Sequence, residues 1–534
     1  MPQSSPRSPA GNGPLCLLSN GRYTTMLSAS GSGFSRWHGL AVTRWREDPV
    51  TDPWGSYVLL RDEDSGASWS ATLQPFGGGD DGDTVAFDAG RATFARRIDG
   101  LQSTLDVAVA ADADLELRRL TLVNHGDAPR TVSLTSYMEL VLGPAAADDA
   151  HPAFSKMFVQ TEWHAASGLL LATRRRRSNA QAEVWAAHAV HVENMPVDPM
   201  VEYGTDRARF LGRGRGLRQA LAMQPGHRLS SSCGCVLDPV FSLRQRVTLA
   251  PGERVRVQFW TQLADSREGV MALAARMREA DAGERLFAGA ARHAAAERER
   301  LGIDAVQIGR FAVWLHALLL ADATHRAAAA VLARGRGGPP TLWAKGISGD
   351  RPIMVLRLGD AAAAGRAREA LLAQRYWQGL QLGVDVVLLD ASDGDAVQAM
   401  LQPLADAHQA QLKAVAGAAK AELFVLRESA IDAGLRDGLF TAARVLIDTT
   451  RTPAADVTAT PATVAMPQPL PVVVHPTPAP AADRPTLEFD NGTGGFVDDG
   501  HAYRIRLDAQ RTTPAPWVNV IANPVFGCMV SAEG

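Results

Sequence analysis

One stretch near the N-terminus concentrates side chains that could hold a sugar. Between Ser35 and Trp54 the chain places three tryptophans among several charged residues. The apolar face of a sugar ring stacks on an exposed aromatic side chain, and its hydroxyls hydrogen-bond to charged groups. The candidate substrate-binding residues are Trp37, Arg44, Trp45, Arg46, Glu47, Asp48 and Trp54. The alternative, which the pattern favours slightly, is that these tryptophans belong to the core and that the charges pair between strands.

No side chain is predicted to be catalytic. Inverting cleavage of a glycosidic bond needs a proton donor for the leaving oxygen and an activated nucleophile on the opposite face. Asp350 could donate such a proton, but residues 349–352 (GDRP) are more typical of a turn that enters a strand. His151 and His188 stand alone in the sequence, which is more typical of packed or exposed histidines than of ligands.

The sequence also predicts no cofactor and no metal. Ligands of parallel sheets bind at the carboxyl ends of the strands, which here are residues 359–360, 390–393 and 428. No GxGxxG or GxxxxGK[ST] pattern follows any of these ends, so nothing there is built to cradle a phosphate. Cys233 and Cys235 have no second pair of Cys or His nearby at zinc-site spacing, and we expect reduced cysteines in a cytosolic compartment.

The overall charge gives no argument for nucleic acid or anionic lipid as a partner. The 534 residues carry a formal net charge of -3, with 46% hydrophobic and 21% charged residues. The run Arg174 to Arg177 could bind an anion, but a solvated strand end or hairpin explains it better. The N-terminal segment lacks the apolar region of a signal peptide, and no stretch reaches about 18 apolar residues, so we expect no direct membrane span.

The hydrophobic pattern changes along the chain and divides it into parts. Short alternating runs separated by turn signals predict antiparallel strands, whereas strands that alternate with helices predict a small parallel sheet. A Pro- and Ala-rich run without a period predicts an extended, disordered linker. The expected order is a disordered N-terminus (1–13), a β-sandwich (14–264), a helical linker (265–339), an α/β unit (340–451), a Pro/Ala-rich linker (452–485) and the start of a second β-sandwich (486–534).

A repeat supports the second sandwich. Residues 17–31 (LLSNGRYTTMLSASG) align without gaps on residues 520–534 (VIANPVFGCMVSAEG). Asn20 matches Asn523, Met26 matches Met529, and apolar or aromatic positions correspond along both segments. A repeated segment indicates a repeated structural unit. We therefore expect a second sandwich to begin here and to stop within its first strands, which would make this end truncated.

Many segments, in one order, resemble the glycosyltransferase-36 region of the cyclic β-1,2-glucan synthase family. None is decisive alone, but together they span nearly everything from residue 14 to residue 534. They include 17–23 (LLSNGRY), 31–37 (GSGFSRW), 41–49 (AVTRWREDP), 52–55 (DPWG), 151–155 (HPAFS), 203–214 (YGTDRARFLGRG), 342–350 (LWAKGISGD), 491–496 (NGTGGF) and 513–524 (TPAPWVNVIANP).

The resemblance implies a multidomain β plus α/β fold. Its parts would be a large antiparallel, galactose-mutarotase-like β-sandwich, a helical linker and related sandwiches placed before an (α/α)6 barrel. Cellobiose- and chitobiose-type phosphorylases are relatives of this family. The parent synthase is an inner-membrane protein that uses UDP-glucose. In such phosphorylases the general acid and most phosphate ligands lie on the barrel, and no run of paired helices typical of a barrel is found in this sequence. No catalytic residue is therefore carried over.

Two functions remain open. The first is a carbohydrate-binding, scaffolding segment of a cyclic β-1,2-glucan synthase that is not catalytic alone. The second is a glycoside phosphorylase or glycosyltransferase that becomes active only with a barrel from a partner chain. The expected partners are a β-glucan or oligosaccharide, the remainder of the synthase and, in the second case, a homodimer. The expected location is the cytoplasm or the cytoplasmic side of the inner membrane.

Overall fold

A computed structural model of the chain shows two compact units, 1–465 and 466–534. The N-terminal 1–13 segment and the 452–485 linker lie outside the residues that the structure describes. The described residues are 15–48, 51–78, 82–178, 181–193, 201–279, 281–320, 322–335, 338, 340–392, 394–414, 419–450, 486–507 and 512–532.

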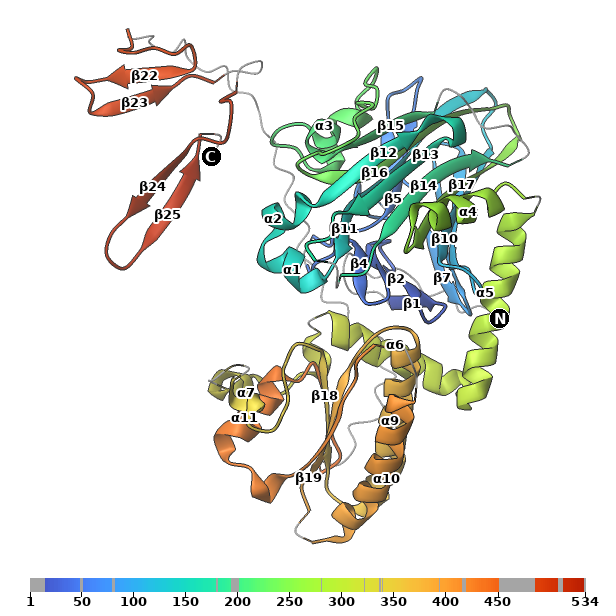
Figure 1. Cartoon of the computed structure of the whole chain (residues 1–534), viewed down its shortest axis with the longest axis vertical. Coiled ribbons are helices and arrows are strands. Elements are labelled where there is room, and N and C mark those ends of the chain that lie inside the picture. The colour runs from blue at the N-terminus through green and yellow to red at the C-terminus, as the bar shows by residue number, and fades with distance from the viewer. Residues whose placement is uncertain are drawn as a thin grey trace. The chain divides into compact units, whose positions relative to one another are not determined.

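Two antiparallel sheets form the larger part of the first unit (Figure 1). Within the described residues, the first sheet has nine strands, ordered β1-β2-β3-β4-β11-β16-β15, with β5 paired to β11 and β6 paired to β5. These strands are β1 (Leu15–Ser19), β2 (Tyr23–Ser28), β3 (Gly33–Trp37), β4 (Leu40–Thr43), β5 (Tyr57–Asp62), β6 (Ser68–Ser70), β11 (Arg130–Gly143), β15 (Glu202–Asp206) and β16 (Pro239–Leu249).

The second sheet has the order β12-β13-β14-β17-β10-β9-β8-β7. Its strands are β7 (Thr84–Asp88), β8 (Arg91–Ile98), β9 (Leu101–Val109), β10 (Leu115–Asn124), β12 (Val159–His164), β13 (Leu169–Arg174), β14 (Trp185–Val192) and β17 (Arg254–Ala264). Short helices in the connections are α1 (Ala145–Ala150), α2 (Pro152–Lys156) and α3 (Arg207–Leu211), with 3-10 turns at Ala165–Ser167, Leu217–Gln219 and Leu221–Met223.

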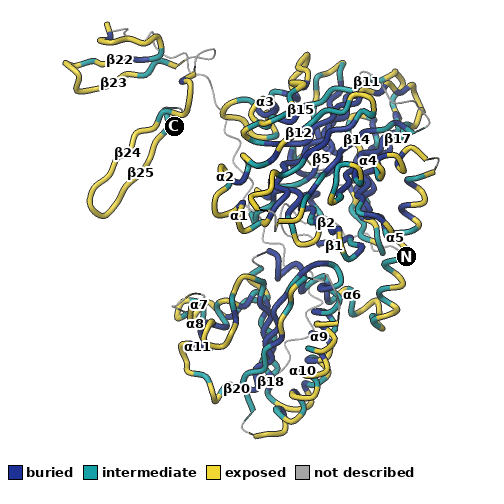
Figure 2. Tube along the Cα trace, viewed as in Figure 1, coloured by how far each residue is buried: buried dark blue, intermediate teal, exposed yellow. Residues whose placement is uncertain are grey.

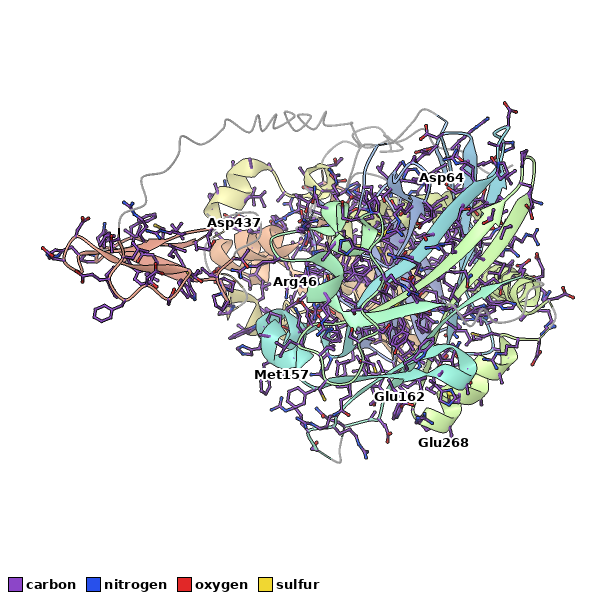
Figure 3. The ribbon with its side chains drawn as sticks, turned by 90° about the horizontal axis from the view of Figure 1, so that it is seen from above. Arg46, Asp64, Met157, Glu162, Glu268 and Asp437 are labelled. Carbon is purple, nitrogen blue, oxygen red and sulfur yellow. The ribbon has the colours of Figure 1, made fainter. Side chains whose placement is uncertain are left out.

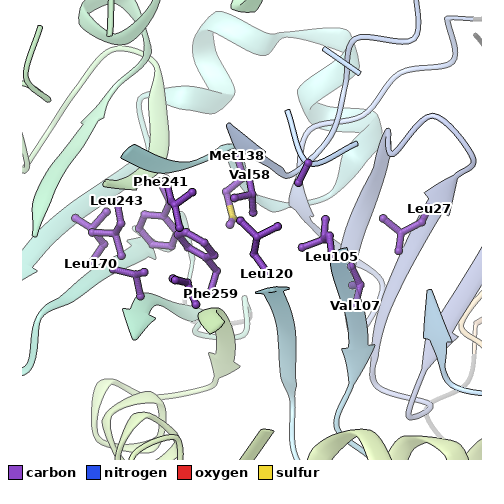
Figure 4. Close-up of a cluster of buried hydrophobic side chains, with 14 of the residues drawn as sticks. Leu27, Val58, Leu105, Val107, Leu120, Met138, Leu170, Phe241, Leu243 and Phe259 are labelled. Carbon is purple, nitrogen blue, oxygen red and sulfur yellow. The ribbon is translucent and has the colours of Figure 1, made fainter. Parts of the chain in front are cut away.

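The main core lies between the two sheets (Figure 4). Val58 and Phe241 from the first sheet meet Leu105, Leu120 and Phe259 from the second, and all five are buried. Side chains of a strand alternate between its two faces, so each strand contributes every second residue to this layer. The predicted antiparallel sandwich is confirmed.

Helices follow the sandwich, as the composition predicted. They are α4 (Arg267–Arg276), α5 (Ala282–Leu301), α6 (Ala305–Leu319), a 3-10 turn (Ala323–His325), α7 (Ala329–Arg334) and α8 (Pro340–Trp343). The first two cover the outer face of the second sheet, where Val270 and Phe287 pack with Leu117 and Trp260. No helix among the described residues is long and apolar enough to cross a membrane.

The α/β unit contains a parallel sheet ordered β20-β19-β18-β21. Strands β18, β19 and β20 end where the sequence predicted strand ends, near residues 359, 390 and 428, and the short β21 was not predicted. Helices cover both faces of the sheet, with α9 and α10 on one side and α11 on the other (Figure 1). The elements are β18 (Ile353–Leu358), a 3-10 turn (Ala361–Ala363), α9 (Ala364–Gly379), β19 (Asp385–Asp390), α10 (Ala396–Lys413), β20 (Leu423–Arg427), a 3-10 turn (Glu428–Ala430), α11 (Ala433–Ala442) and β21 (Val445–Asp448).

The α/β unit packs against the outer face of strands β1 to β3. Met26 and Phe34 share a buried cluster with Phe311 of α6 and Trp377 of α9. The Thr24 hydroxyl donates to the Leu380 carbonyl at 3.0 Å. The first sheet is therefore covered on both faces at this edge, which explains why all six residues of β2 are buried (Figure 2).

The second unit contains two hairpins, β22 (Gly494–Val497) with β23 (Ala502–Ile505) and β24 (Val518–Ala522) with β25 (Gly527–Ser531). The second hairpin repeats β1–β2 in register, because Leu17 faces Met26 as Val520 faces Met529. The turns agree as well. The side-chain oxygen of Asn20 accepts the backbone N–H groups of residues 22 and 23, and that of Asn523 accepts those of residues 525 and 526.

Candidate functional site

A small open pocket lies beside β3, β4 and α1 in the first unit. Its empty volume is about 280 Å³, part of which is open solvent. Two of the seven candidate residues, Arg44 and Trp45, line it. The lining residues are Phe34, Arg36, Ala41, Thr43, Arg44, Trp45, Val141, Ala145, Asp148 and Asp149.

The strand pair β3–β4 decides which side chains reach the pocket. The two strands are joined at His38 and Gly39, whose φ values of 48° and 79° are typical of a tight hairpin turn. Alternation along β3 then sends Phe34 and Arg36 to the pocket. It sends Trp37 inward, where this side chain is 6% exposed in the main core and its indole Nε1 donates to Asp114 at 2.7 Å.

Arg44 holds α1 against the strands. Its Nε and Nη2 donate to the two carboxylate oxygens of Asp148 at 2.8 and 3.0 Å, and its Nη1 donates to Glu139 at 2.7 Å. Burial alone would lower the pKa of Arg44, but the two carboxylates outweigh it and raise that pKa above its ordinary value. The pKa of Glu139 is lowered despite its burial, because Arg207 and Arg44 stabilise the carboxylate. Arg44 therefore positions the wall that carries Asp148 and Asp149.

Two other donors of the pocket have no acceptor among the described residues. The Arg36 guanidinium lies 4.2 Å from the centre of the Phe34 ring and forms no hydrogen bond or ion pair with another described residue. Its pKa is lowered by burial, an effect that nearby Asp149 partly offsets. The indole Nε1 of Trp45 is buried and has no acceptor among the described residues. Buried donors without partners cost free energy, which a bound hydroxyl oxygen would recover.

The aromatic rings supply an apolar wall. Phe34 and Trp45 contact edge to face, with ring centres 5.6 Å apart. Opposite charges lie close to these rings, since Asp149 accepts from Arg46 at 3.2 Å at the edge of the pocket. An apolar wall beside unpaired donors and carboxylate acceptors suits a neutral, polyhydroxylated ligand.

The other candidates lie outside the pocket. The Arg46 guanidinium lies 5.9 Å from the centre of the Trp54 ring (Arg46 is labelled in Figure 3). Glu47 pairs with Arg444 of the α/β unit. The Asp48 carboxylate accepts the Thr51 backbone N–H at 2.9 Å. Of the predicted segment, Arg44 and Trp45 line the pocket, and the whole set stays a prediction. The lining also contains Phe34, Arg36, Asp148 and Asp149, which were not among the candidates (the last two lie some hundred positions away).

The remaining titratable residues considered in the sequence occupy other places. Asp350 is exposed in a bend before β18. His188 is buried between the sheets, where its ring nitrogens hydrogen-bond with Ser136 at 2.9 Å and Thr261 at 3.1 Å. Burial lowers its pKa to about 4. Across the described parts of the chain, no three His, Cys, Asp or Glu side chains are placed to share a metal ion.

Comparisons with known proteins agree on the family. The family model for the supersandwich domain of glycosyl hydrolase 94 matches residues 4–280 and 501–534. The cyclic beta-(1,2)-glucan synthase NdvB of Rhizobium meliloti (strain 1021) is 34% identical over 531 residues, which is 97% of this chain and 19% of that protein. The N,N'-diacetylchitobiose phosphorylase of Vibrio furnissii is 25% identical over 244 residues, 45% of this chain and 29% of that protein.

Solved structures show distant likenesses. A bacterial glucoamylase complexed with acarbose has a TM-score of 0.35 at 8% identity, covering 60% of this chain and 42% of that chain. A galactose mutarotase-like protein from Clostridium acetobutylicum has a TM-score of 0.26 at 8% identity, covering 50% of this chain and 99% of that chain.

The chain spans about a fifth of the length of the synthase and less than a third of the phosphorylase. The family match covers more than half of the chain and includes both copies of the repeated hairpin. The resemblance to the glucan synthase region is confirmed, and the chain belongs to the glycosyl hydrolase 94 family through its supersandwich domain.

Proposed function

We propose that this chain is a carbohydrate-binding, scaffolding segment of a cyclic β-1,2-glucan synthase and that it binds the glucan at the pocket around Trp45. The observation that carries the proposal is a pair of donors beside two aromatic rings, the Arg36 guanidinium and the Trp45 indole N–H, neither of which has an acceptor in the part of the chain that the structure describes. The 34% identity with a glucan synthase supports β-glucan as the ligand class.

The expected binding mode follows from the lining. A glucose ring would place its C–H face toward Trp45, because the Phe34 ring is buried beneath the Arg36 guanidinium. The sugar hydroxyl oxygens would accept from Arg36 and from the Trp45 indole. The Asp149 carboxylate would accept from a sugar hydroxyl in a charge-assisted hydrogen bond. Phe34 and Trp45 already pack against each other, so they lose little conformational freedom on binding, which favours affinity.

Besides the glucan, the proposal includes a protein partner and a location in the cell. The segment would contact the remainder of the synthase and act in the cytoplasm or on the cytoplasmic side of the inner membrane. The four cysteines support this compartment, since all of them are free thiols.

Isothermal titration with β-1,2-linked gluco-oligosaccharides tests the proposal. Trp45→Phe keeps an aromatic ring and removes the indole N–H, so we expect the Kd to rise about five- to tenfold, the effect of losing one hydrogen bond. Trp343→Phe is the matched control, because Trp343 is exposed on α8 and does not line the pocket. Equal affinity of Trp45→Phe and the original chain, or no heat of binding at all, would refute the assignment.

The relation to a chitobiose phosphorylase favours a second candidate function. Under this second function, the chain would contribute to phosphorolysis or glucosyl transfer only together with a partner chain that supplies a barrel, or in a homodimer. Assays with β-1,2-gluco-oligosaccharide and phosphate, or with UDP-glucose, separate the two when the chain is tested alone and together with a polypeptide that carries the barrel. Turnover that requires this chain and is lost on substitution of Arg36 would favour the enzyme over the binding segment.

A further inference from the structure

A cationic, partly apolar surface lies where α2 meets the end of β13. It consists of Phe154, Met157, Phe158 and the three arginines 175 to 177, and we call it the Arg–Phe patch. The α2 turn and the arginine run are joined, because the Arg175 backbone N–H donates to the Phe158 carbonyl at 2.8 Å. Val159 also pairs with Arg174 in the strand register.

The charges of the Arg–Phe patch are largely unneutralised. Among the described residues, Arg175 and Arg177 form no side-chain ion pair. Arg176 reaches Glu183 only at 3.9 Å, and both side chains are more than 40% exposed, so solvent screens this pair. Lys156, the neighbouring cation, is already paired with Asp238 at 2.8 Å. The patch is locally cationic although the whole chain has a net charge of -3.

The apolar members of the patch face solvent. Phe154 is 47% exposed and Met157 is 53% exposed, and Met157 lies at the outer side of the molecule (Figure 3). Large apolar side chains next to cations, on an otherwise folded surface, are typical of an interaction site. A partner of this patch must therefore offer both negative charge and an apolar phase.

The arginines cover the aromatic faces. Arg175 lies 5.5 Å from the Phe158 ring centre, and Arg177 lies 5.4 Å from that of Phe154. The two rings contact edge to face at 5.0 Å. Nucleic-acid bases would have to displace these guanidiniums in order to stack. A bilayer interface requires no such change, because the rings and Met157 can enter the headgroup layer while the guanidiniums meet the phosphates.

We infer that the Arg–Phe patch docks on the surface of an anionic lipid bilayer. Each arginine near an anionic membrane surface strengthens binding by about fivefold, and the exposed Phe and Met side chains add a contribution that does not depend on salt. Arg174 acts as a positioning residue, since its Nη1 donates to the carbonyls of Ser155 at 2.9 Å and Val141 at 3.2 Å. The inference concerns a surface separate from the lining of the sugar pocket and stands independently of it.

Co-sedimentation of the full chain with vesicles tests the inference. We expect binding to vesicles of phosphatidylcholine and phosphatidylglycerol, weaker binding at high salt, and little binding to pure phosphatidylcholine. The double substitution R175Q/R177Q should weaken binding about 30-fold. The control R228Q/R285Q removes the same charge from exposed sites outside the patch and should change binding less than about twofold.

A second variant separates the apolar contribution. F154S/M157S leaves the charge unchanged and should weaken binding about tenfold, with the loss persisting at high salt. Circular dichroism and the melting temperature of each variant confirm that it is folded. The inference is overturned by absent binding to the anionic vesicles, by equal binding to both vesicle types, by unchanged binding of R175Q/R177Q, or by tighter binding of an oligonucleotide than of the vesicles.

Discussion

Glu47 and Arg444 form a two-pronged ion pair between the segment that follows β4 and the residue that precedes β21. The two carboxylate oxygens accept from the two terminal guanidinium nitrogens at 2.8 and 2.7 Å. The pair joins parts of the chain that lie 397 positions apart. Planar, two-pronged pairs of this kind fix orientation as well as distance. Together with the shared apolar cluster around Phe311, this contact fixes the α/β unit on the sandwich.

Removing one partner of this pair should loosen that contact. Both side chains are partly exposed, 24% for Glu47 and 31% for Arg444, so we expect Glu47→Gln to cost about 1 kcal/mol. Hydrogen exchange should accelerate in β21 more than in the sandwich core. The double variant with Arg444→Gln should cost little more than either single one. Additive losses would mean that the two residues act separately.

Breaking the Arg44 network should have a larger effect. Arg44→Gln leaves the buried Asp148 carboxylate without its paired guanidinium and Glu139 with Arg207 alone, so we expect a loss of about 3–5 kcal/mol in the free energy of unfolding. Urea denaturation measures this loss. Arg46→Gln is the control, because its pair with Asp149 is exposed and should matter by less than about 1 kcal/mol. Similar losses in both variants would contradict the positioning role of Arg44.

The stability of the sandwich should fall in mild acid. Burial lowers the pKa of His188 to about 4 from an ordinary value of 6.5, so the unfolded chain binds this proton more readily than the folded chain. The free energy of unfolding is therefore unaffected by this residue above about pH 6.5. It declines by up to about 3 kcal/mol as the pH falls toward 4, because His188 must be kept neutral in the folded chain. His188→Gln should flatten this pH dependence of unfolding, whereas substitution of the exposed His151 should not.

The α/β unit should respond to acid in the same direction. Burial and the nearby Arg375 lower the pKa of His408 to about 4, and its Nε2 contacts the Gln374 side chain at 2.7 Å. Protection of β18 and β19 against hydrogen exchange should therefore decrease between pH 6.5 and 4. His408→Gln should remove this decrease without changing that of the sandwich. An identical decrease in the variant would assign the effect to another group.

Deleting residues 484–534 should leave the first unit folded. The hairpin β24–β25 exposes Val520, Ile521, Phe526 and Met529 by 57–70% each (Figure 2). Exposed apolar strands favour association with other chains. We expect an unchanged melting temperature of the sandwich and less light scattering on heating. A large drop in melting temperature would show that these residues are an integral part of the first domain.

Local patterns in the sequence were sufficient to predict which parts of the chain form antiparallel strands, helices and a parallel sheet. The alternating run of residues 115–123 became β10, which is buried on both faces because the other sheet covers one side and α5 covers the other. The apolar runs of the α/β unit became a parallel sheet because helices cover both of its faces. The repeat of residues 17–31 predicted a shared hairpin, since an Asn side chain that accepts two backbone N–H groups specifies the same turn in both copies. Each of these features depends on residues close together in the chain.

The composition of the pocket was decided by the tertiary structure. Sequence could not distinguish Trp37, which enters the core, from Trp45, whose indole lines the pocket, because the register of β3 and β4 sets the face of each. It could not place Asp148 beside Arg44, since this contact forms only when α1 folds back from the end of β11. Long-range ion pairs leave no periodic signal in a sequence. The positions of the donors and acceptors of the pocket are therefore fixed only when the two sheets, α1 and the α/β unit have packed together.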